Sequence, residues 1–276
     1  MSDLPRENPL LTDSDRQRYM MVLSYDGAPF NGWQVQPNAV TVQEKIEEAL
    51  RTLLKTPLHI VGAGRTDTGV SARHMVAHFD VPSSVASLID EQRLRKALNS
   101  ILRPAIAVHG IVRTLPDRHA RFDAESRTYR YYLHMVHDPF RTEKSLFWHQ
   151  KTDFDLMNAE VASLLGKKDF TSFSKLHTDT NNNLCEVTSA GWHRYGPSHY
   201  YFEITANRFL RNMVRSVVGT LLDVGVGKYP PGHIKNILEK HDRCAAGTSM
   251  PGNALFLWDI GYPYELPANL LPEDMI

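Results

Sequence analysis

The sequence is poor in cysteine and has no long hydrophobic run. Of its 276 residues only Cys185 and Cys244 are cysteines, and they form no CxxC pair. The sequence therefore argues against a disulfide framework and against thiolate-metal or redox chemistry. No apolar stretch approaches the ~20 residues that a membrane helix needs, and residues 1–18 are polar and acidic rather than an apolar signal segment. We therefore expect a cytoplasmic protein that does not contact a membrane.

Net charge is also absent, because 31 Lys and Arg residues balance 31 Asp and Glu residues. Taken alone, this balance argues against a nucleic-acid partner. The charges are segregated, however: residues 1–15 carry −3 and residues 253–276 carry −4, which leaves +7 in the interior. Residues 93–130 alone hold nine basic and three acidic side chains, interleaved with aromatic ones. This mixture suits contacts to phosphates and bases, although a solvated basic face explains it equally well.

The composition, with 42% hydrophobic and 22% charged residues, is that of a globular protein. Hydrophobic periodicity predicts the same order of elements, β-α-β-β-α-β, twice. In the first half we expect strands at 18–26, 58–61, 75–81 and 105–113, and helices at 41–55 and 88–102, capped by Thr41 and Ser87. In the second half we expect strands at 127–135, 185–194, 199–206 and 254–262, and helices at 154–165, 208–224 and 232–241.

This order predicts an α/β protein of the α+β type. Two ferredoxin-like halves would share a mixed, mainly antiparallel central sheet flanked by helices. The N-terminal half would span residues 16–115 and contain the loop 62–70, and the C-terminal half would span residues 116–265. Residues 1–15 and 266–276 would form acidic tails.

The most unusual stretch is VGAGRTDTGV at 61–70, which lies between two predicted strands. Its three glycines indicate backbone conformations or close approaches that a side chain would forbid. Such a loop can hold one functional side chain rigidly, and Asp67 is the candidate, with Arg65 placed to favour its ionised form. The simpler alternative is a tight turn in which Asp67 bonds only its own backbone.

Several familiar motifs nearly fit this loop and fail on physical grounds. It lacks the third glycine of a dinucleotide site and the lysine of a phosphate-binding loop. Asp67-Thr68-Gly69 is the aspartic-protease tripeptide, but such a protease needs a second carboxylate and the chain has no second Asp-Thr-Gly. His74 and His78, if they lie on a strand, are ~13 Å apart, too far for one ion. We therefore expect neither a metal nor a cofactor.

A second candidate feature is the predicted helix at 208–224. At helical spacing Arg208, Arg211 and Arg215 share one stripe with Asn212 and Gly219, opposite an apolar face. This stripe is interpreted either as a solvated polar face or as an arginine ridge that faces a polyanion or a carboxylate.

From about Tyr19 to Pro263 the sequence resembles the tRNA pseudouridine synthase A (TruA) family. The matching pieces, in the family's order, are YDG at 25–27, GWQ at 32–34, TVQEKIEEAL at 41–50, AGRTDTGV at 63–70, HMVAHF at 74–79, FDAESRTYRY at 122–131, DFTSF at 169–173 and NRFLRNMVRSVVGTLLDVG at 207–225. The resemblance implies an isomerase that converts uridine to pseudouridine at positions 38, 39 and 40 of the anticodon arm of tRNAs, without a cofactor, as a homodimer with a basic cleft.

The resemblance also implies roles for individual residues. Asp67 matches the catalytic aspartate, Tyr129 the tyrosine that packs on the flipped-out target base, and Arg215 the basic partner of the aspartate. Substrate contacts are expected from Tyr129, Arg65, Leu255, Arg113, Arg121, Arg208 and Arg211. Ser71 stands where the family usually has a histidine, and this difference is expected to alter RNA contacts. Asn253-Ala254-Leu255 replaces the family's usual Gly-Leu, which leaves Leu255 as the candidate for the uracil pocket. An RNA-binding module without catalysis and a protease remain the alternatives.

Overall fold

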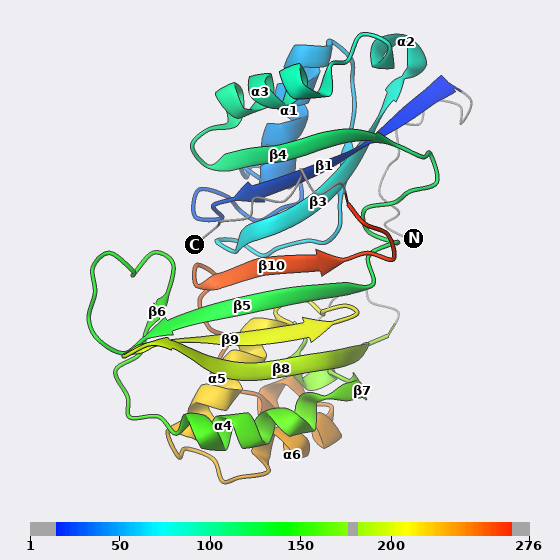
Figure 1. Ribbon diagram of the computed structural model, residues 1–276. Helices are drawn as coiled ribbons and strands as arrows, with labels where there is room; N and C mark the ends of the chain where they lie inside the picture. Colours follow the sequence, from blue (N-terminus) through cyan, green and yellow to red (C-terminus); the bar gives the residue numbers. More distant parts are fainter. Residues whose placement is uncertain (1–14, 176–181, 267–276) are drawn as a thin grey trace. The chain divides into compact units, whose positions relative to one another are not determined.

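The computed structural model describes residues 15–175 and 182–266, so the predicted acidic tails lie almost wholly outside the described residues. The chain divides into two compact units (Figure 1). Unit 1 comprises the residues up to Glu125 together with those from Asp259 onwards, and unit 2 comprises Ser126–Trp258.

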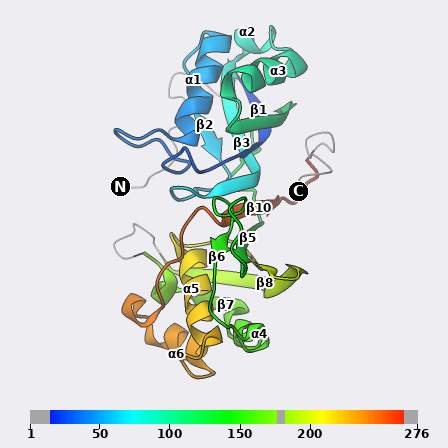
Figure 2. The same cartoon turned by 90° about the vertical axis from the view of Figure 1, so that its left-hand side faces the viewer.

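Unit 1 is an antiparallel sheet covered by helices. Its elements are β1 (Arg16–Tyr25), α1 (Val42–Leu54), β2 (Ile60–Gly62), β3 (Ser71–Pro82), α2 (Ser83–Ala86), α3 (Glu91–Leu102) and β4 (Ile106–Thr114). β1 pairs with β3 on one edge and with β4 on the other, and β2 pairs with β3. Figure 2 shows α1 and α3 packed side by side. The predicted β-α-β-β-α-β order of this half is confirmed.

The two main helices of unit 1 begin at side-chain caps. α1 begins as predicted, because the Thr41 hydroxyl accepts the Glu44 N–H at 3.4 Å. The predicted start of the second helix at Ser87 was wrong: Ser87 closes the short α2, and α3 begins after Asp90, whose carboxylate accepts the Arg93 N–H at 2.9 Å. Both residue types are good caps, and only Asp90 directly precedes residues that continue as a full helix.

Unit 2 repeats the pattern. Its elements are β5 (Ser126–His134), β6 (Leu146–Phe147), α4 (Phe154–Val161), β7 (Gly166–Asp169), β8 (Leu184–Gly196), β9 (His199–Ala206), α5 (Met213–Gly225), α6 (His233–Lys240) and the first part of β10 (Leu255–Gly261). The strand order is β10-β5-β9-β8-β7, and β8 and β9 form the predicted hairpin. Figure 1 shows α4, α5 and α6 together on one side of these strands. The predicted fold class, α+β with a mainly antiparallel sheet flanked by helices, is confirmed.

Strand β3 is more buried than its alternating sequence predicts. We expected a half-buried strand, but within Ser71–Pro82 only Arg73 and Pro82 escape full burial. The reason is that both faces are covered: Phe79 stacks on Tyr19, and His78 lies against His119, whose ring centroid is 4.6 Å away. The His78 Nδ1 accepts the Ala120 N–H at 3.1 Å, and burial lowers the pKa of His78 to about 2. His78 is therefore a neutral core residue.

Candidate active site

The glycine-rich loop connects β2 to β3 at the end of the unit 1 sheet. The Val70 N–H bonds the Asp67 carbonyl at 3.1 Å, which closes a tight turn over residues 67–70. Gly69 has φ +77°, a conformation that glycine adopts without strain. Within this loop Thr66 is buried, Asp67 is half-buried and Arg65 is exposed. The turn therefore leaves the Asp67 side chain partly open to solvent.

Two of the three glycines behave as predicted. A Cβ at Gly62 would lie 2.6 Å from the Trp33 ring, so the indole packs directly on the backbone there. Gly69 needs its positive φ. The expectation was wrong for Gly64, around which nothing lies within 4 Å of an added Cβ. Only the two ends of the loop are thus under steric constraint.

A second segment, residues 25–33, braces the loop on both sides of Asp67. The hydroxyls of Tyr25 and Thr66 lie 2.9 Å apart, and the Trp33 N–H bonds the Thr66 carbonyl at 3.2 Å. Beyond Asp67, the Gly69 N–H bonds the Phe30 carbonyl at 3.3 Å. We call residues 25–33 the brace. These bonds fix the backbone immediately before and after the carboxylate.

The brace also depends on two close backbone approaches. Gly32 has φ +90°, and a Cβ there would lie 2.5 Å from the Thr66 carbonyl oxygen. A Cβ at Gly27 would lie 2.2 Å from the Val70 carbonyl oxygen. The Ser71 hydroxyl accepts the Gly27 N–H at 3.0 Å and is buried, so Ser71 supports the brace, and its effect on RNA contacts stays a prediction. The sequence signal for the brace was the pair of glycines in YDG and GWQ, whose structural role the periodicity did not show.

The Tyr25–Thr66 pair should contribute measurably to stability. We expect Thr66→Val to lower the free energy of unfolding by about 1–3 kcal/mol, because it leaves the buried Tyr25 hydroxyl without its partner. Thr66→Ser keeps the hydroxyl and should cost less. Urea denaturation of Thr66→Val, Tyr25→Phe and the double variant measures the coupling, which we expect to be about 1 kcal/mol. Strictly additive losses would show that the two hydroxyls do not interact.

In unit 2, Tyr129 lies on β5 with its ring half-buried. The ring meets Phe209 edge to face, with centroids 5.1 Å apart. Alternation along the strand places Tyr129 on the same face as Tyr131 and Leu133, which are both buried. The Tyr131 hydroxyl donates to the Pro251 carbonyl at 3.1 Å. Tyr129 therefore lies at the partly open end of a buried aromatic face.

Arg215 lies on α5 beside the segment 247–251. Its Nε donates to the Met250 carbonyl at 2.5 Å, and the Met250 N–H returns a bond to the Arg215 carbonyl at 3.1 Å. Burial raises the pKa of Tyr131, and the charge of Arg215 opposes that rise. Because the Tyr131 hydroxyl and the Arg215 guanidinium bond neighbouring carbonyls, those of Pro251 and Met250, the guanidinium lies on the side of β5 that carries Tyr131. Unit 2 thus brings Tyr129 and Arg215 to one side of the same strand.

The predicted arginine ridge is wrong. α5 begins at Met213, and Asn212 before it has φ +68°, a left-handed conformation that asparagine tolerates. Arg208 and Arg211 consequently lie in the loop before the helix, off the stripe of Arg215. The Arg211 carbonyl accepts the Lys175 N–H at 3.0 Å, and Arg208 Nη1 lies 3.5 Å from the Asn182 Oδ1.

The remaining predicted contacts are placed separately. Arg113 is exposed on β4 and its Nε bonds the Gln17 side chain. Arg121 is exposed in the segment after β4, with its guanidinium 6.0 Å from the Phe122 ring centre. Leu255, at the start of β10, is buried within unit 2. The predicted site residues are therefore divided: Arg65, Asp67, Arg113 and Arg121 belong to unit 1, and Tyr129, Arg208, Arg211, Arg215 and Leu255 belong to unit 2.

Two of the histidines and both cysteines were considered in the sequence as possible metal or redox groups. His74 and His78 both lie on β3, and His74 Nδ1 donates to the Asp259 carboxylate at 2.6 Å. Among the described residues, no three His, Cys, Asp or Glu side chains gather closely enough to hold a metal ion. Cys185 is buried, which raises its pKa to about 11, and Cys244 is exposed. No helix in the described part of the chain has the length and apolarity needed to cross a membrane.

Comparison with known proteins gives one consistent result. Residues 161–263 match the family model described as tRNA pseudouridine synthase. The chain is 51% identical to the tRNA pseudouridine synthase A of Parabacteroides distasonis over 250 residues, and these residues cover 91% of this chain and 98% of that protein. The protein of the same name from Bacteroides fragilis is 46% identical over 250 residues, which cover 91% of this chain and 98% of that protein. The one from Bacillus subtilis is 37% identical over 249 residues, which cover 89% of this chain and 99% of that protein. At these identities over almost the full length of the relatives, the chain belongs to the tRNA pseudouridine synthase A family.

Proposed function

We propose that this protein isomerises uridine to pseudouridine at positions 38, 39 and 40 of the anticodon arm of tRNAs, with Asp67 as the catalytic carboxylate. The supporting observation is the braced loop. Hydrogen bonds from Tyr25, Phe30 and Trp33 hold the residues on both sides of Asp67. A catalytic group works best when the surrounding structure fixes its position before the substrate binds.

The proposed reaction requires few groups besides a positioned carboxylate. The bond between uracil N1 and ribose C1′ breaks, the uracil turns, and a bond forms between C5 and C1′. The proton on C5 leaves to solvent and N1 gains one, so atoms and charge balance without an oxidant, a reductant or an added group. The Asp67 carboxylate either attacks as a nucleophile or assists an elimination that forms a glycal. The half-buried position of Asp67 leaves it accessible to a substrate.

Tyr129 and Arg215, which both belong to unit 2, are the other proposed catalytic residues. The target base has to leave its stack at a cost of a few kcal/mol, and an aromatic ring that packs on it offsets part of that cost. Tyr129 has the half-buried ring and the rigid neighbour, Phe209, that this role needs. The Tyr129 hydroxyl is the candidate base for the C5 proton. Arg215, anchored on Met250, is the proposed partner of the Asp67 carboxylate.

The RNA contacts and the assembly state rest on the same proposal. Arg65, Arg113, Arg121 and Arg211 are exposed and Arg208 is half-buried, so all five are available to phosphates, and Leu255 is assigned to the uracil pocket. The basic charge of these side chains would hold the anticodon arm. The homodimer and the cytoplasmic location remain predictions from the sequence.

Release of tritium from tRNA labelled at uridine C5 tests the reaction directly, because forming pseudouridine must expel the C5 hydrogen. We expect release from unmodified bacterial tRNA with no change in the mass of unlabelled tRNA. Replacing the uridines at 38–40 by cytidine should abolish release and would locate the positions. An RNA-binding module would bind tRNA and release no tritium, an outcome that would refute the proposed reaction.

Tyr129→Phe separates the ring from the hydroxyl. The phenylalanine ring still packs on the base, so we expect tRNA affinity within about twofold of wild type. Loss of a general base should slow tritium release by about 10²-fold or more. Tyr195→Phe, at an exposed tyrosine on β8, is the matched control and should release tritium at the wild-type rate. If Tyr129→Phe releases tritium as fast as the control, the hydroxyl is not the base.

A further inference from the structure

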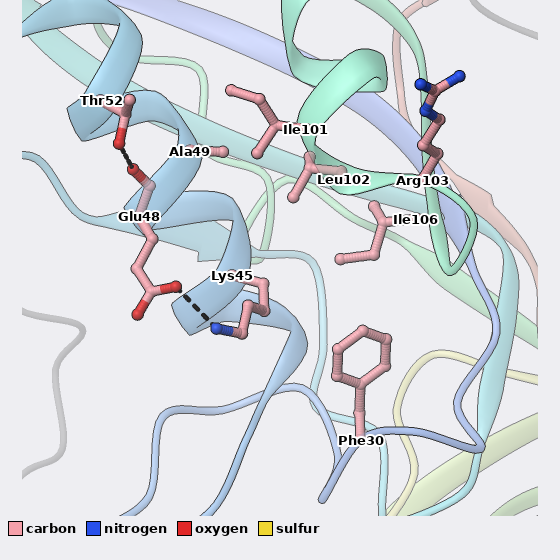
Figure 3. A pocket seen from close by; sticks show the side chains of 9 residues that line it. All are labelled: Phe30, Lys45, Glu48, Ala49, Thr52, Ile101, Leu102, Arg103 and Ile106. Carbon is pink, nitrogen blue, oxygen red and sulfur yellow. Dashed lines mark hydrogen bonds and ion pairs between the residues drawn. The ribbon is translucent and has the colours of Figure 1, made fainter.

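A groove lies between α1 and α3 in unit 1 (Figure 3). It has a volume of about 430 Å³, and its apolar floor includes Phe30, Leu102 and Ile106. Ile101 forms part of its wall and remains 49% exposed. Lys45 on α1 and Arg103 at the end of α3 supply the cations at its margins. Glu48 also lines the groove and pairs with Lys45, so two cations and one carboxylate give the apolar groove a net charge of +1.

The positive charge continues along the outer face of α3. Arg93 and Lys96 are exposed on α3, and their spacing of three residues places them on one side of the helix. Arg103, which is also exposed, follows the last residue of α3 in an extended conformation. None of the three forms a side-chain hydrogen bond or ion pair with another residue in the described ranges. Lys45 pairs only with Glu48 on the same helix, and both side chains are more than 40% exposed, so this pair is cheap to break. We call Arg93, Lys96 and Arg103 the α3 basic face.

The dimensions suit a strand of nucleic acid. Ten residues of α-helix separate Arg93 from Arg103, a distance of ~15 Å at ~1.5 Å per residue. One nucleic-acid strand rises ~3.4 Å per nucleotide along a duplex axis, so the face spans about four phosphates. A ribose or base of the same strand would find apolar contacts on the groove floor.

The groove also adjoins the brace of the catalytic loop. Phe30, whose ring forms the floor, accepts the Gly69 N–H through its carbonyl oxygen at 3.3 Å. A strand seated in the groove would therefore contact the residue that supports the turn after Asp67. This places the groove close enough to serve the same substrate.

We propose that the α1–α3 groove and the α3 basic face bind the phosphate backbone of a second segment of the tRNA, separate from the nucleotide that reacts. This proposal rests on the proposed function, because it takes the bound polyanion to be the tRNA substrate. It assigns a binding role to Lys45, Arg93, Lys96 and Arg103, and it gives a use to the exposed charge of the α3 basic face.

The salt dependence of tRNA affinity tests this surface. For Lys96→Gln/Arg103→Gln in the full-length protein we expect affinity for unmodified tRNA at 50 mM salt to fall about tenfold or more. The slope of log K against log salt should shrink by about 0.7–0.9 for each lost phosphate contact. The matched control is Lys235→Gln/Lys240→Gln, which removes the same charge from exposed positions of α6 and should change the affinity less than threefold.

A second variant tests the groove without changing its cations. Ile101→Glu places a carboxylate on the exposed groove wall and should weaken tRNA binding in the same assay. Circular dichroism of each variant establishes that it folds. If both sets of variants bind tRNA like the α6 control, with the wild-type slope, the proposed surface is refuted. If the wild type shows the predicted slopes but releases no tritium, the proposed reaction falls and the binding surface stands.

Discussion

Replacing Asp67 by asparagine is expected to lower pseudouridine formation by about 10⁴-fold or more while leaving tRNA affinity within about twofold of wild type. Removing a covalent nucleophile typically costs this much, because the remaining groups cannot take over its bond. Asparagine has nearly the shape of aspartate, so the braced loop should keep its geometry. The hydroxyl pair of Tyr25 and Thr66 and the Gly69 bond to Phe30 do not involve the carboxylate.

The measurement is single-turnover tritium release at saturating enzyme, combined with a separate titration of tRNA binding. Asp117→Asn, at an exposed position of the same unit, is the matched control and should retain wild-type turnover. Urea denaturation of both variants shows whether stability has changed. An Asp67→Asn protein that releases tritium within tenfold of the control would remove Asp67 from the chemical step.

Gly219→Ala is expected to lower the free energy of unfolding by about 3 kcal/mol. Gly219 lies in α5 against the segment 247–251, and an added Cβ would lie 1.9 Å from the Thr248 carbonyl oxygen. A backbone oxygen cannot rotate away as a side chain can, so the helix or the segment has to move. That segment is tied to α5 by the Gly247 N–H bond to the Thr220 hydroxyl at 2.9 Å and by the two Arg215–Met250 bonds.

Gly64→Ala provides the contrast for this prediction, because an added Cβ there meets nothing within 4 Å and its φ is ordinary. We expect its free energy of unfolding to change by less than about 1 kcal/mol. Gly219→Ala should also lower the rate of tritium release, because the displaced segment carries the anchor of Arg215. Equal stability of the two variants would mean that the contact at Gly219 relaxes without cost.

Local patterns in the sequence determined most of the architecture. The apolar residues of 41–55 recur at helical spacing after the Thr41 cap, and α1 forms over Val42–Leu54. The turn residues at 195–198 predicted the hairpin that β8 and β9 form. Both features depend on neighbours in the chain, and local sequence is enough to predict them.

Features set by distant residues were missed. The burial of β3 depends on His119 and Tyr19, which lie 41 and 60 residues from the side chains they cover, His78 and Phe79. The helical pattern of residues 208–224 continues through Asn212, and only the backbone shows that α5 starts after it. Periodicity reports which residues could share a face, and packing decides whether they do.

The fold class, the family and the choice of Asp67 as the candidate carboxylate could all be predicted from the sequence. These predictions follow from periodicity and from motifs in which all the informative residues are close in the chain. What holds that carboxylate is visible only in the folded protein. The brace brings Tyr25, Phe30 and Trp33 against residues 66–69, some 33 to 41 positions later. It does so through one pair of hydroxyls, two backbone bonds and two glycine contacts, none of which leaves a periodic pattern in the sequence. The fold also determines which cations are exposed: Arg118 and Arg130 lie against aromatic rings, whereas Arg93, Lys96 and Arg103 remain exposed. Charge is counted along the chain, but its availability to RNA depends on where folding places each side chain.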